Sequence, residues 1–139
     1  MNVEIDQIMR GSVMTGTPHQ TKGHVRQVMA EHRISAFPIV DPEDVPVGMV
    51  TAADLLLDHP DGAPVSTFMS SPVLTVPRYE KPHIAARIMR NHRIHHLVVT
   101  EDHKAVGIVS AFDLLHLIED HRFVAKPGPT PRAKDRKRR

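Results

Sequence analysis

Hydrophobic residues recur at helical spacing in two short segments of the chain. The stripes consist of Val25, Val28, Met29 and His32 in the first half, and of Ile84, Ala85, Ile88, Met89 and His92 in the second. Residues spaced in this way lie on one face of an α-helix, so each segment is predicted to pack one face against a core. Both helices are expected to end near a shared HRI sequence, at 32–34 and 92–94.

Each predicted helix is followed by two short apolar runs that are separated by turn-forming residues. The runs span residues 37–41, 45–51, 96–101 and 105–110. Their β-branched residues predict strands, and the short turns within each pair predict antiparallel hairpins. Helical periodicity resumes after each hairpin, over 52–59 and 111–121, and the sequence HPDG is expected to stop the first of these helices.

These elements occur twice because the chain contains a tandem repeat. VMAEHRIS at 28–35 matches IMRNHRIH at 88–95 at an offset of 60. VGMVTAAD at 47–54 matches VGIVSAFD at 106–113 at an offset of 59. A repeat of this length predicts two similar structural units.

The two copies are predicted to differ ahead of their first helix. Met14 precedes Met29 by 15 residues, whereas Met69 precedes Met89 by 20, so the first copy is expected to lack about five residues there. The second copy holds a strand-like PVLTV at 72–76 in this region. The first copy offers only GTPHQTKG, whose Gly, Pro and polar residues make a poor strand.

Length and composition suggest how the chain is divided. Its 139 residues are enough for about one ordinary domain. We expect a first repeat with an N-terminal helix over 1–62, a second repeat over 63–124 and a disordered basic tail over 125–139. The tail holds seven Lys/Arg and one acid, a charge of +6, which leaves 11 Lys/Arg and 15 acids, a charge of −4, for the rest of the chain.

Residue content argues against several classes of function. The absence of cysteine excludes disulfides, thiolate nucleophiles and sulfur-ligated metals. His92, His95 and His96 are not expected to share an ion, because adjacent strand residues point to opposite faces, so no metal site is predicted. Neither Thr51 nor Ser110 has an evident base and orienting acid, so the chain is not expected to be an enzyme.

The location of the protein is predicted from its amino terminus and its hydropathy. The first residues include acids where an export signal needs positive charge, and no apolar run approaches the roughly 18 residues of a membrane helix. Together with the absence of cysteine, these features predict a cytoplasmic protein that has no membrane segment.

A hydroxyl residue is followed three positions later by an acid in both copies, as Thr51-x-x-Asp54 and Ser110-x-x-Asp113. This spacing is that of a capping box, in which the two side chains bond the backbone at a helix start. The same groups would suit a nucleotide, because free N–H groups attract phosphate and a carboxylate accepts hydrogen bonds from ribose hydroxyls. A four-residue motif by itself leaves both interpretations open, the helix cap and the nucleotide site.

The duplicated helix, hairpin and Ser/Thr-x-x-Asp pattern over about residues 11–122 closely resembles a tandem pair of CBS domains, named after cystathionine β-synthase. The resemblance implies an α+β fold of two repeats, each a three-stranded sheet with two helices, packed around a pseudo-twofold axis. It also implies regulatory binding of AMP, ADP, ATP or S-adenosylmethionine, without a catalytic cofactor. The resemblance implies a homodimer assembled helix to helix, and symmetric dimers are also the commonest soluble oligomers.

The resemblance further implies two clefts, each combining the Ser/Thr-x-x-Asp of one repeat with the first strand and preceding residues of the other. The preferred site comprises Thr51, Asp54, Leu74, Thr75, Val76, His95 and His96. The second comprises Thr17, Ser35, Ala36, Phe37, Ser110 and Asp113. In both, the acid would hold the ribose and the hydroxyl would approach the phosphate. The first is preferred because the second has a truncated strand and no cation at 35–36.

A second class of function is left open by the sequence. The motif acids would then serve only as helix caps, and the chain would be a ligand-free interaction module whose tail docks on nucleic acid or a protein partner. Nucleic-acid binding by the body of the chain is not expected, because its charge is −4 and the whole chain has one Tyr, four Phe and no Trp for base stacking.

Overall fold

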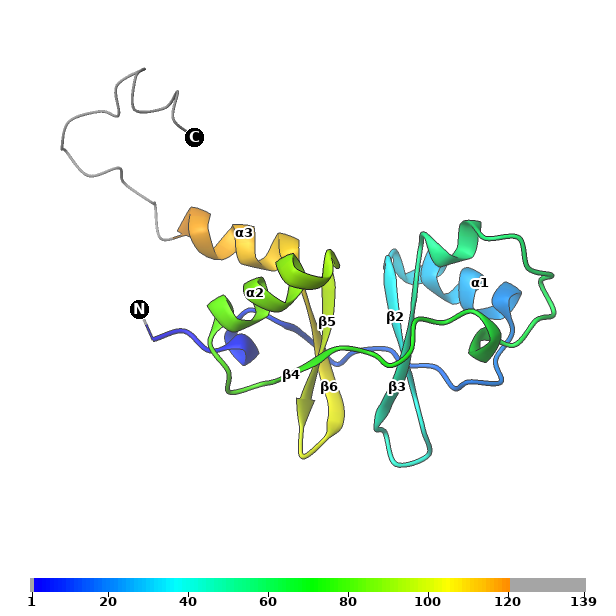
Figure 1. The fold of residues 1–139 in the computed structure, drawn as a ribbon, viewed down its shortest axis with the longest axis horizontal. Helices are drawn as coiled ribbons and strands as arrows, with labels where there is room; N and C mark the ends of the chain where they lie inside the picture. Colours follow the sequence, from blue (N-terminus) through cyan, green and yellow to red (C-terminus); the bar gives the residue numbers. More distant parts are fainter. Residues whose placement is uncertain (1, 121–139) are drawn as a thin grey trace, which may run out of the picture.

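The computed structural model describes residues 2–120, so the predicted tail over 125–139 lies outside the described residues. Two α+β units lie next to each other within this range, each with its strands toward the middle of the molecule and its helices toward the outside (Figure 1). This arrangement confirms the predicted fold class. No helix of the described range is long and apolar enough to cross a membrane.

Each unit is built on a hairpin. The first contains α1 (Lys22–His32), β2 (Ala36–Val40), β3 (Pro46–Thr51) and a single 3-10 turn, η2 (Asp54–Leu56). The second contains β4 (Thr75–Pro77), α2 (Pro82–His92), β5 (His96–Glu101), β6 (Lys104–Ser110) and α3 (Ala111–Asp120). Three short elements flank them: η1 (Ile5–Gln7), β1 (Arg10–Gly11) and η3 (Val65–Thr67). Both predicted hairpins are confirmed as antiparallel pairs, and the expected N-terminal helix is only the turn η1.

The predicted helix ends at the two HRI sequences are also confirmed. Arg33 and Arg93 follow α1 and α2 in the left-handed conformation, with φ values of 53° and 55°. The next backbone N–H then turns back to the helix, as that of Ile34 does to the Met29 carbonyl at 3.0 Å. The backbone by itself ends each helix, so neither guanidinium group is needed there.

The two sheets share the same arrangement of strands, but the first sheet is less complete than the second. The second has the strand order β1-β6-β5-β4, in which only β4 and β5 are parallel. The first has only β2 and β3, but Gly16 forms a parallel bridge with Ile39 at one edge and Ser70 an antiparallel bridge with Met49 at the other. The implied three-stranded sheet is therefore reduced to two strands in the first unit and extended to four in the second.

The parallel edge of the first sheet stops at Gly16 because of the residues that follow. The backbone N–H of Thr17 donates to Gln20 Oε1 at 3.2 Å instead of to a strand, and Pro18 has no N–H to donate. The expectation that GTPHQTKG forms a poor strand is confirmed.

The expected deficit of five residues in the first copy is wrong. Met9 and Met69 hold equivalent positions, because a Cβ atom on Gly107 would overlap the Met9 sulfur and one on Gly48 would overlap the Met69 sulfur. Met9 lies 20 residues before the helix methionine of its copy, the same spacing as in the second copy. The prediction had aligned Met69 with Met14, since the true match, IDQIM with VSTFM, has only its methionine in common.

Each hydrophobic core also includes a residue from a short segment that flanks the helices and hairpins. Ile5 is fully buried in the core of the second unit. Val65 is fully buried in the core of the first unit, where Phe68 also packs. Figure 1 shows the N-terminal segment running along the second sheet before it crosses to the first unit. Val65 lies beyond the predicted boundary at residue 62, so that boundary does not separate the cores.

The helix predicted over 52–59 is wrong, because this segment forms only the turn η2, whereas its counterpart in the second copy forms α3. The buried ammonium group of Lys22 donates to the carbonyls of Leu57 and His59 and holds them in a loop. Pro60 also disfavours the helical conformation of the residue before it. The chain therefore leaves the helix after a single turn.

The two sheets contact each other through a small third cluster. Ala36 and Met49 from the first sheet are buried together with Val98 from the second. Partly buried Val73, Ala105 and Ile108 pack around them. This contact is apolar and close to the middle of the molecule, so its geometry sets the space between the units.

A polar contact lies beside this cluster. Ser35 Oγ and His96 Nε2 are 3.4 Å apart, a side-chain hydrogen bond between the units. Burial lowers the pKa of His96, the neighbouring His95 lowers it further, and Asp113 opposes both effects. Because the ordinary pKa is already near 6.5, this lowering favours the neutral imidazole of His96 in the folded protein.

We expect Gly107→Ala to destabilise the protein by about 1–3 kcal/mol, because its Cβ would collide with the Met9 side chain and the Arg10 carbonyl. Gly48→Ala should cost less, since there the nearest atoms all belong to the flexible Met69 side chain. Gly11→Ala, which has open space, is the control. Urea unfolding measures all three, and a Gly107→Ala protein as stable as the control would contradict this packing.

The lowered pKa of His96 predicts a loss of stability in acid. The unfolded state binds a proton below about pH 6.5 while folded His96 resists protonation, so the free energy of unfolding falls as the pH decreases through this range. Comparing urea unfolding at about pH 7.5 and pH 5.5, we expect His96→Asn to lose less stability than the wild type. His83→Asn, at an exposed helical position, should behave as wild type, and an unchanged slope in His96→Asn would refute the assignment.

Candidate functional site

Two clefts lie where the units meet, and each draws residues from both. The Ser110 cleft has a volume of about 350 Å³ and the Thr51 cleft about 510 Å³, each within the usual range of small-molecule sites. His96 and Ser35 line both clefts, so the hydrogen bond between them stands at the partition.

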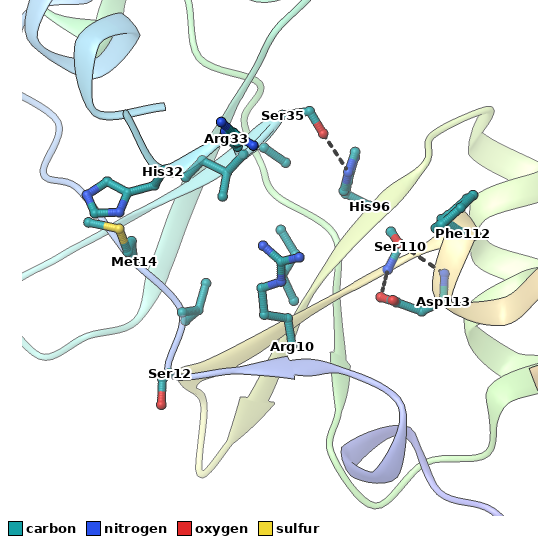
Figure 2. A pocket seen from close by; sticks show the side chains of 14 residues that line it. Arg10, Ser12, Met14, His32, Arg33, Ser35, His96, Ser110, Phe112 and Asp113 are labelled. Atoms are coloured by element: carbon teal, nitrogen blue, oxygen red, sulfur yellow. Dashed lines mark hydrogen bonds between the residues drawn. The ribbon is translucent and has the colours of Figure 1, made fainter. Parts of the chain in front are cut away.

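The Ser110 cleft joins the start of α3 to the N-terminal segment and the α1–β2 turn. Its lining is Arg10, Ser12, Val13, Met14, His32, Arg33, Ile34, Ser35, Ala36, His96, Ile108, Ser110, Phe112 and Asp113. In Figure 2 the Arg10 side chain projects from β1 into the space between the units, and Asp113 lies across from it at the start of α3. The cleft therefore combines cations, a carboxylate and a few apolar side chains.

The Thr51 cleft joins the end of β3 to the residues before β4 and the α2–β5 turn. Its lining is Ser35, Met49, Thr51, Ala52, Ala53, Ser70, Pro72, Val73, Leu74, Arg93, Ile94, His95 and His96. Seven of these residues are apolar, so this cleft is the more hydrophobic of the two.

Both Ser/Thr-x-x-Asp motifs form capping boxes. The Thr51 N–H donates to Asp54 Oδ2 at 2.8 Å, and the Asp54 N–H donates to Thr51 Oγ1 at 3.3 Å. The matching bonds between Ser110 and Asp113 are 2.8 and 3.1 Å. Within the described residues, the second oxygen of each carboxylate accepts no protein hydrogen bond, so the cap leaves an acceptor available to a ligand.

The structure brings together part of the preferred site. Thr51, Leu74, His95 and His96 line the Thr51 cleft. Asp54 does not line it; this residue is half-buried and its carboxylate accepts the Thr51 N–H. Thr75 and Val76 do not line it either. Val76 is buried in the second core and Thr75 is exposed on the opposite face of β4, as alternation along a strand requires.

The second site is likewise assembled in part. Ser35, Ala36, Ser110 and Asp113 line the Ser110 cleft. Phe37 faces the other side of β2 and is buried in the first core. Thr17 lies beyond the Gly16 bridge, in the turn closed by Gln20, and lines neither cleft. The corrected register explains the error, because the residues equivalent to Val73 and Leu74 are Val13 and Met14.

Sequence reasoning missed the arginines. Arg33 and Arg93 each line the cleft next to their helix end. Arg10 also lines the Ser110 cleft, so this cleft has cations even though positions 35–36 supply none. The signal was available, since aligning Met9 with Met69 places Arg10 directly before the segment that flanks the cleft.

Metal binding receives no positive indication. Within residues 2–120, no group of three or more His, Asp or Glu side chains is close enough to hold an ion. The lowered pKa of His96 favours its neutral form, in which the imidazole can act in either cleft as a hydrogen-bond donor or acceptor.

The family model for the CBS domain matches residues 5–58 and 65–120. CBS domain-containing protein YhcV from Bacillus subtilis is 30% identical over 115 residues, covering 79% of this chain and 81% of YhcV. The CBS domain pair of protein MJ0100 in complex with 5′-methylthioadenosine and S-adenosyl-L-methionine has a TM-score of 0.80 at 22% identity, over 87% of this chain and 99% of that one. CBSX2 in complex with AMP has a TM-score of 0.76 at 18% identity, over 86% and 98%.

The chain spans less than two thirds of several curated relatives. It covers 63% of a Methanopyrus kandleri protein that is 31% identical, and 22% of an inosine-5′-monophosphate dehydrogenase of Methanocaldococcus jannaschii that is 28% identical. The match to that enzyme is confined to a small part of its length and carries no dehydrogenase activity to this chain. Two adjacent family matches and the two-unit fold show that this chain belongs to the CBS domain family, as a tandem CBS pair.

Proposed function

We propose that this CBS pair is a regulatory, non-catalytic module that binds an adenosyl ligand, AMP, ADP, ATP or S-adenosylmethionine, in the clefts between its repeats. The observation that carries the proposal is the Ser110–Asp113 capping box at the edge of the Ser110 cleft, with one carboxylate oxygen unused and the Arg10 and Arg33 side chains in the same lining. A ribose, a phosphate chain and an adenine each find complementary groups there.

The proposed roles follow from the chemistry of these groups. The free oxygen of Asp113 accepts hydrogen bonds from the vicinal ribose hydroxyls. Arg10 and Arg33 pair with phosphate oxygens, and Val13 and Met14 offer apolar contacts to the base. Thr51, Arg93 and Leu74 supply an analogous but weaker set in the Thr51 cleft, since Asp54 does not line it.

The comparisons support an adenosyl compound as the ligand class. The MJ0100 domain pair is in complex with 5′-methylthioadenosine and S-adenosyl-L-methionine, and CBSX2 with AMP. Because each cleft here is lined by both repeats, a bound ligand would favour one arrangement of the units over others, and that change is the proposed signal.

We also propose that the module is a cytoplasmic homodimer that presents this change to a protein partner. The supporting feature is a stripe on α3, where Phe112, Leu115 and Ile118 remain 57–67% exposed at helical spacing. Large apolar side chains gathered on one helix face mark an interaction surface more often than ordinary solvent exposure.

Ligand binding is tested by thermal unfolding with AMP, ADP, ATP and S-adenosylmethionine. A ligand at 100 times its dissociation constant should stabilise the wild type by about 2.7 kcal/mol. Asp113→Ala should lose most of this gain, whereas Asp54→Ala, which removes an equivalent capping bond of about 1 kcal/mol, should keep more of it. If none of the four compounds shifts the wild type, freed of copurified nucleotide, the proposal is wrong.

The dimer is tested by sedimentation velocity. Leu115→Glu and Ile118→Glu place charge on the exposed α3 stripe and should convert a dimer into monomers. Tyr79→Glu, at another exposed large side chain in the turn between β4 and α2, is the matched control and should remain dimeric. A monomeric wild type, or dimers unaffected by both α3 changes, would exclude this interface.

A further inference from the structure

The two clefts differ in charge at one pair of equivalent positions. The offset of 60 that matches Met9 with Met69 also matches Arg10 with Ser70. Arg10 lines the Ser110 cleft and Ser70 lines the Thr51 cleft. A permanently charged guanidinium on one side therefore corresponds to a neutral hydroxyl on the other.

The arginines at the helix ends are matched between the clefts, but the motif acids are not matched as lining residues. Arg33 and Arg93 are 60 residues apart, adopt the same left-handed conformation and each line their own cleft. Asp54 and Asp113 accept the same backbone hydrogen bond within their motifs, both at 2.8 Å. The arginine pair cancels in the comparison, whereas only Asp113 of the two acids lines its cleft. The Ser110 cleft therefore offers a ligand two guanidinium groups and a carboxylate, and the Thr51 cleft offers one guanidinium group.

The position of Arg10 is fixed by its backbone, while its side chain is available. β1 pairs with β6 so that Arg10 stands opposite Ile108, which is part of the same cleft lining. Figure 2 shows the guanidinium reaching from this strand into the middle of the cleft. Within the described residues, Arg10 takes part in no ion pair and no side-chain hydrogen bond.

The Thr51 cleft offers different chemistry at the corresponding place. Next to Ser70 its walls are formed by Met49, Pro72, Val73 and Leu74. Apolar side chains favour the uncharged parts of an adenosyl ligand and give no compensation for burying a phosphate chain.

We propose, building on the proposed function, that Arg10 is a specificity-determining residue. By adding a second guanidinium group, it makes the Ser110 cleft prefer adenosyl ligands that carry a phosphate chain, whereas the Thr51 cleft, with Arg93 alone, prefers adenosyl ligands without one. The internal repeat thus provides two sites of one architecture that distinguish ligands by charge.

Isothermal titration with adenosine and with ADP tests this assignment, at about pH 8 so that imidazoles are neutral. Arg10→Ser copies the residue of the other cleft and should weaken ADP binding ~10-fold or more while leaving adenosine within ~2-fold, since only the charge-assisted phosphate contacts are lost. Arg10→Lys should retain most of the ADP affinity, and Ser70→Arg should strengthen ADP binding at the Thr51 cleft.

Salt dependence supplies a second measurement. ADP affinity of the wild type should fall between about 50 and 300 mM NaCl, and Arg10→Ser should flatten this dependence. Equal losses for adenosine and ADP in Arg10→Ser would mean a structural role, and an unchanged ADP affinity would mean no contact; either result overturns the inference but not the proposed function. A wild type that binds neither compound overturns the inference, and the proposed function falls with it only if AMP, ATP and S-adenosylmethionine also fail to bind.

Discussion

The rest of the structure depends on the burial of two short segments, one in the core of each unit. Ile5 enters the second core and Val65 the first, both fully excluded from solvent. The Met9 and Met69 side chains then pack against the sheets at Gly107 and Gly48, because a glycine has no side chain to collide with the sulfur atoms. The chain must therefore pass between the units twice, and the residues on these crossings become walls of the two clefts.

The two interpretations of the Ser/Thr-x-x-Asp motif are compatible in this geometry. Each acid uses one oxygen to accept the backbone N–H of its hydroxyl residue, and the hydroxyl accepts the N–H of the acid. A cap formed in this way fixes the direction of the carboxylate without exhausting its acceptors. Preorganised acceptors lose less entropy on binding, so a structural cap is a suitable foundation for a ligand site.

Small departures from internal symmetry make the clefts unequal. The first unit replaces a second helix with a short turn because Lys22 holds the carbonyls of the following loop, and its sheet edges shrink to single bridges. Arg10 and Ser70 occupy matching places but differ in charge. Such differences alter the lining of each cleft while the apolar contact among Ala36, Met49 and Val98 holds the units in the same relation.

The sequence by itself determined the helices at 22–32 and 82–92, their ends, both hairpins and the duplication, because periodicity and turn residues are local signals. It also indicated Ser35, Ala36, Leu74, Thr51, Ser110 and Asp113 as parts of the inter-repeat clefts, through the resemblance. Only the tertiary structure decided the register before the first helix and the fate of 52–59, since these depend on contacts with distant Gly107 and Lys22. The placement of Arg10 follows from the same cause: its backbone pairs with a strand almost 100 residues away, and no local pattern encodes that pairing.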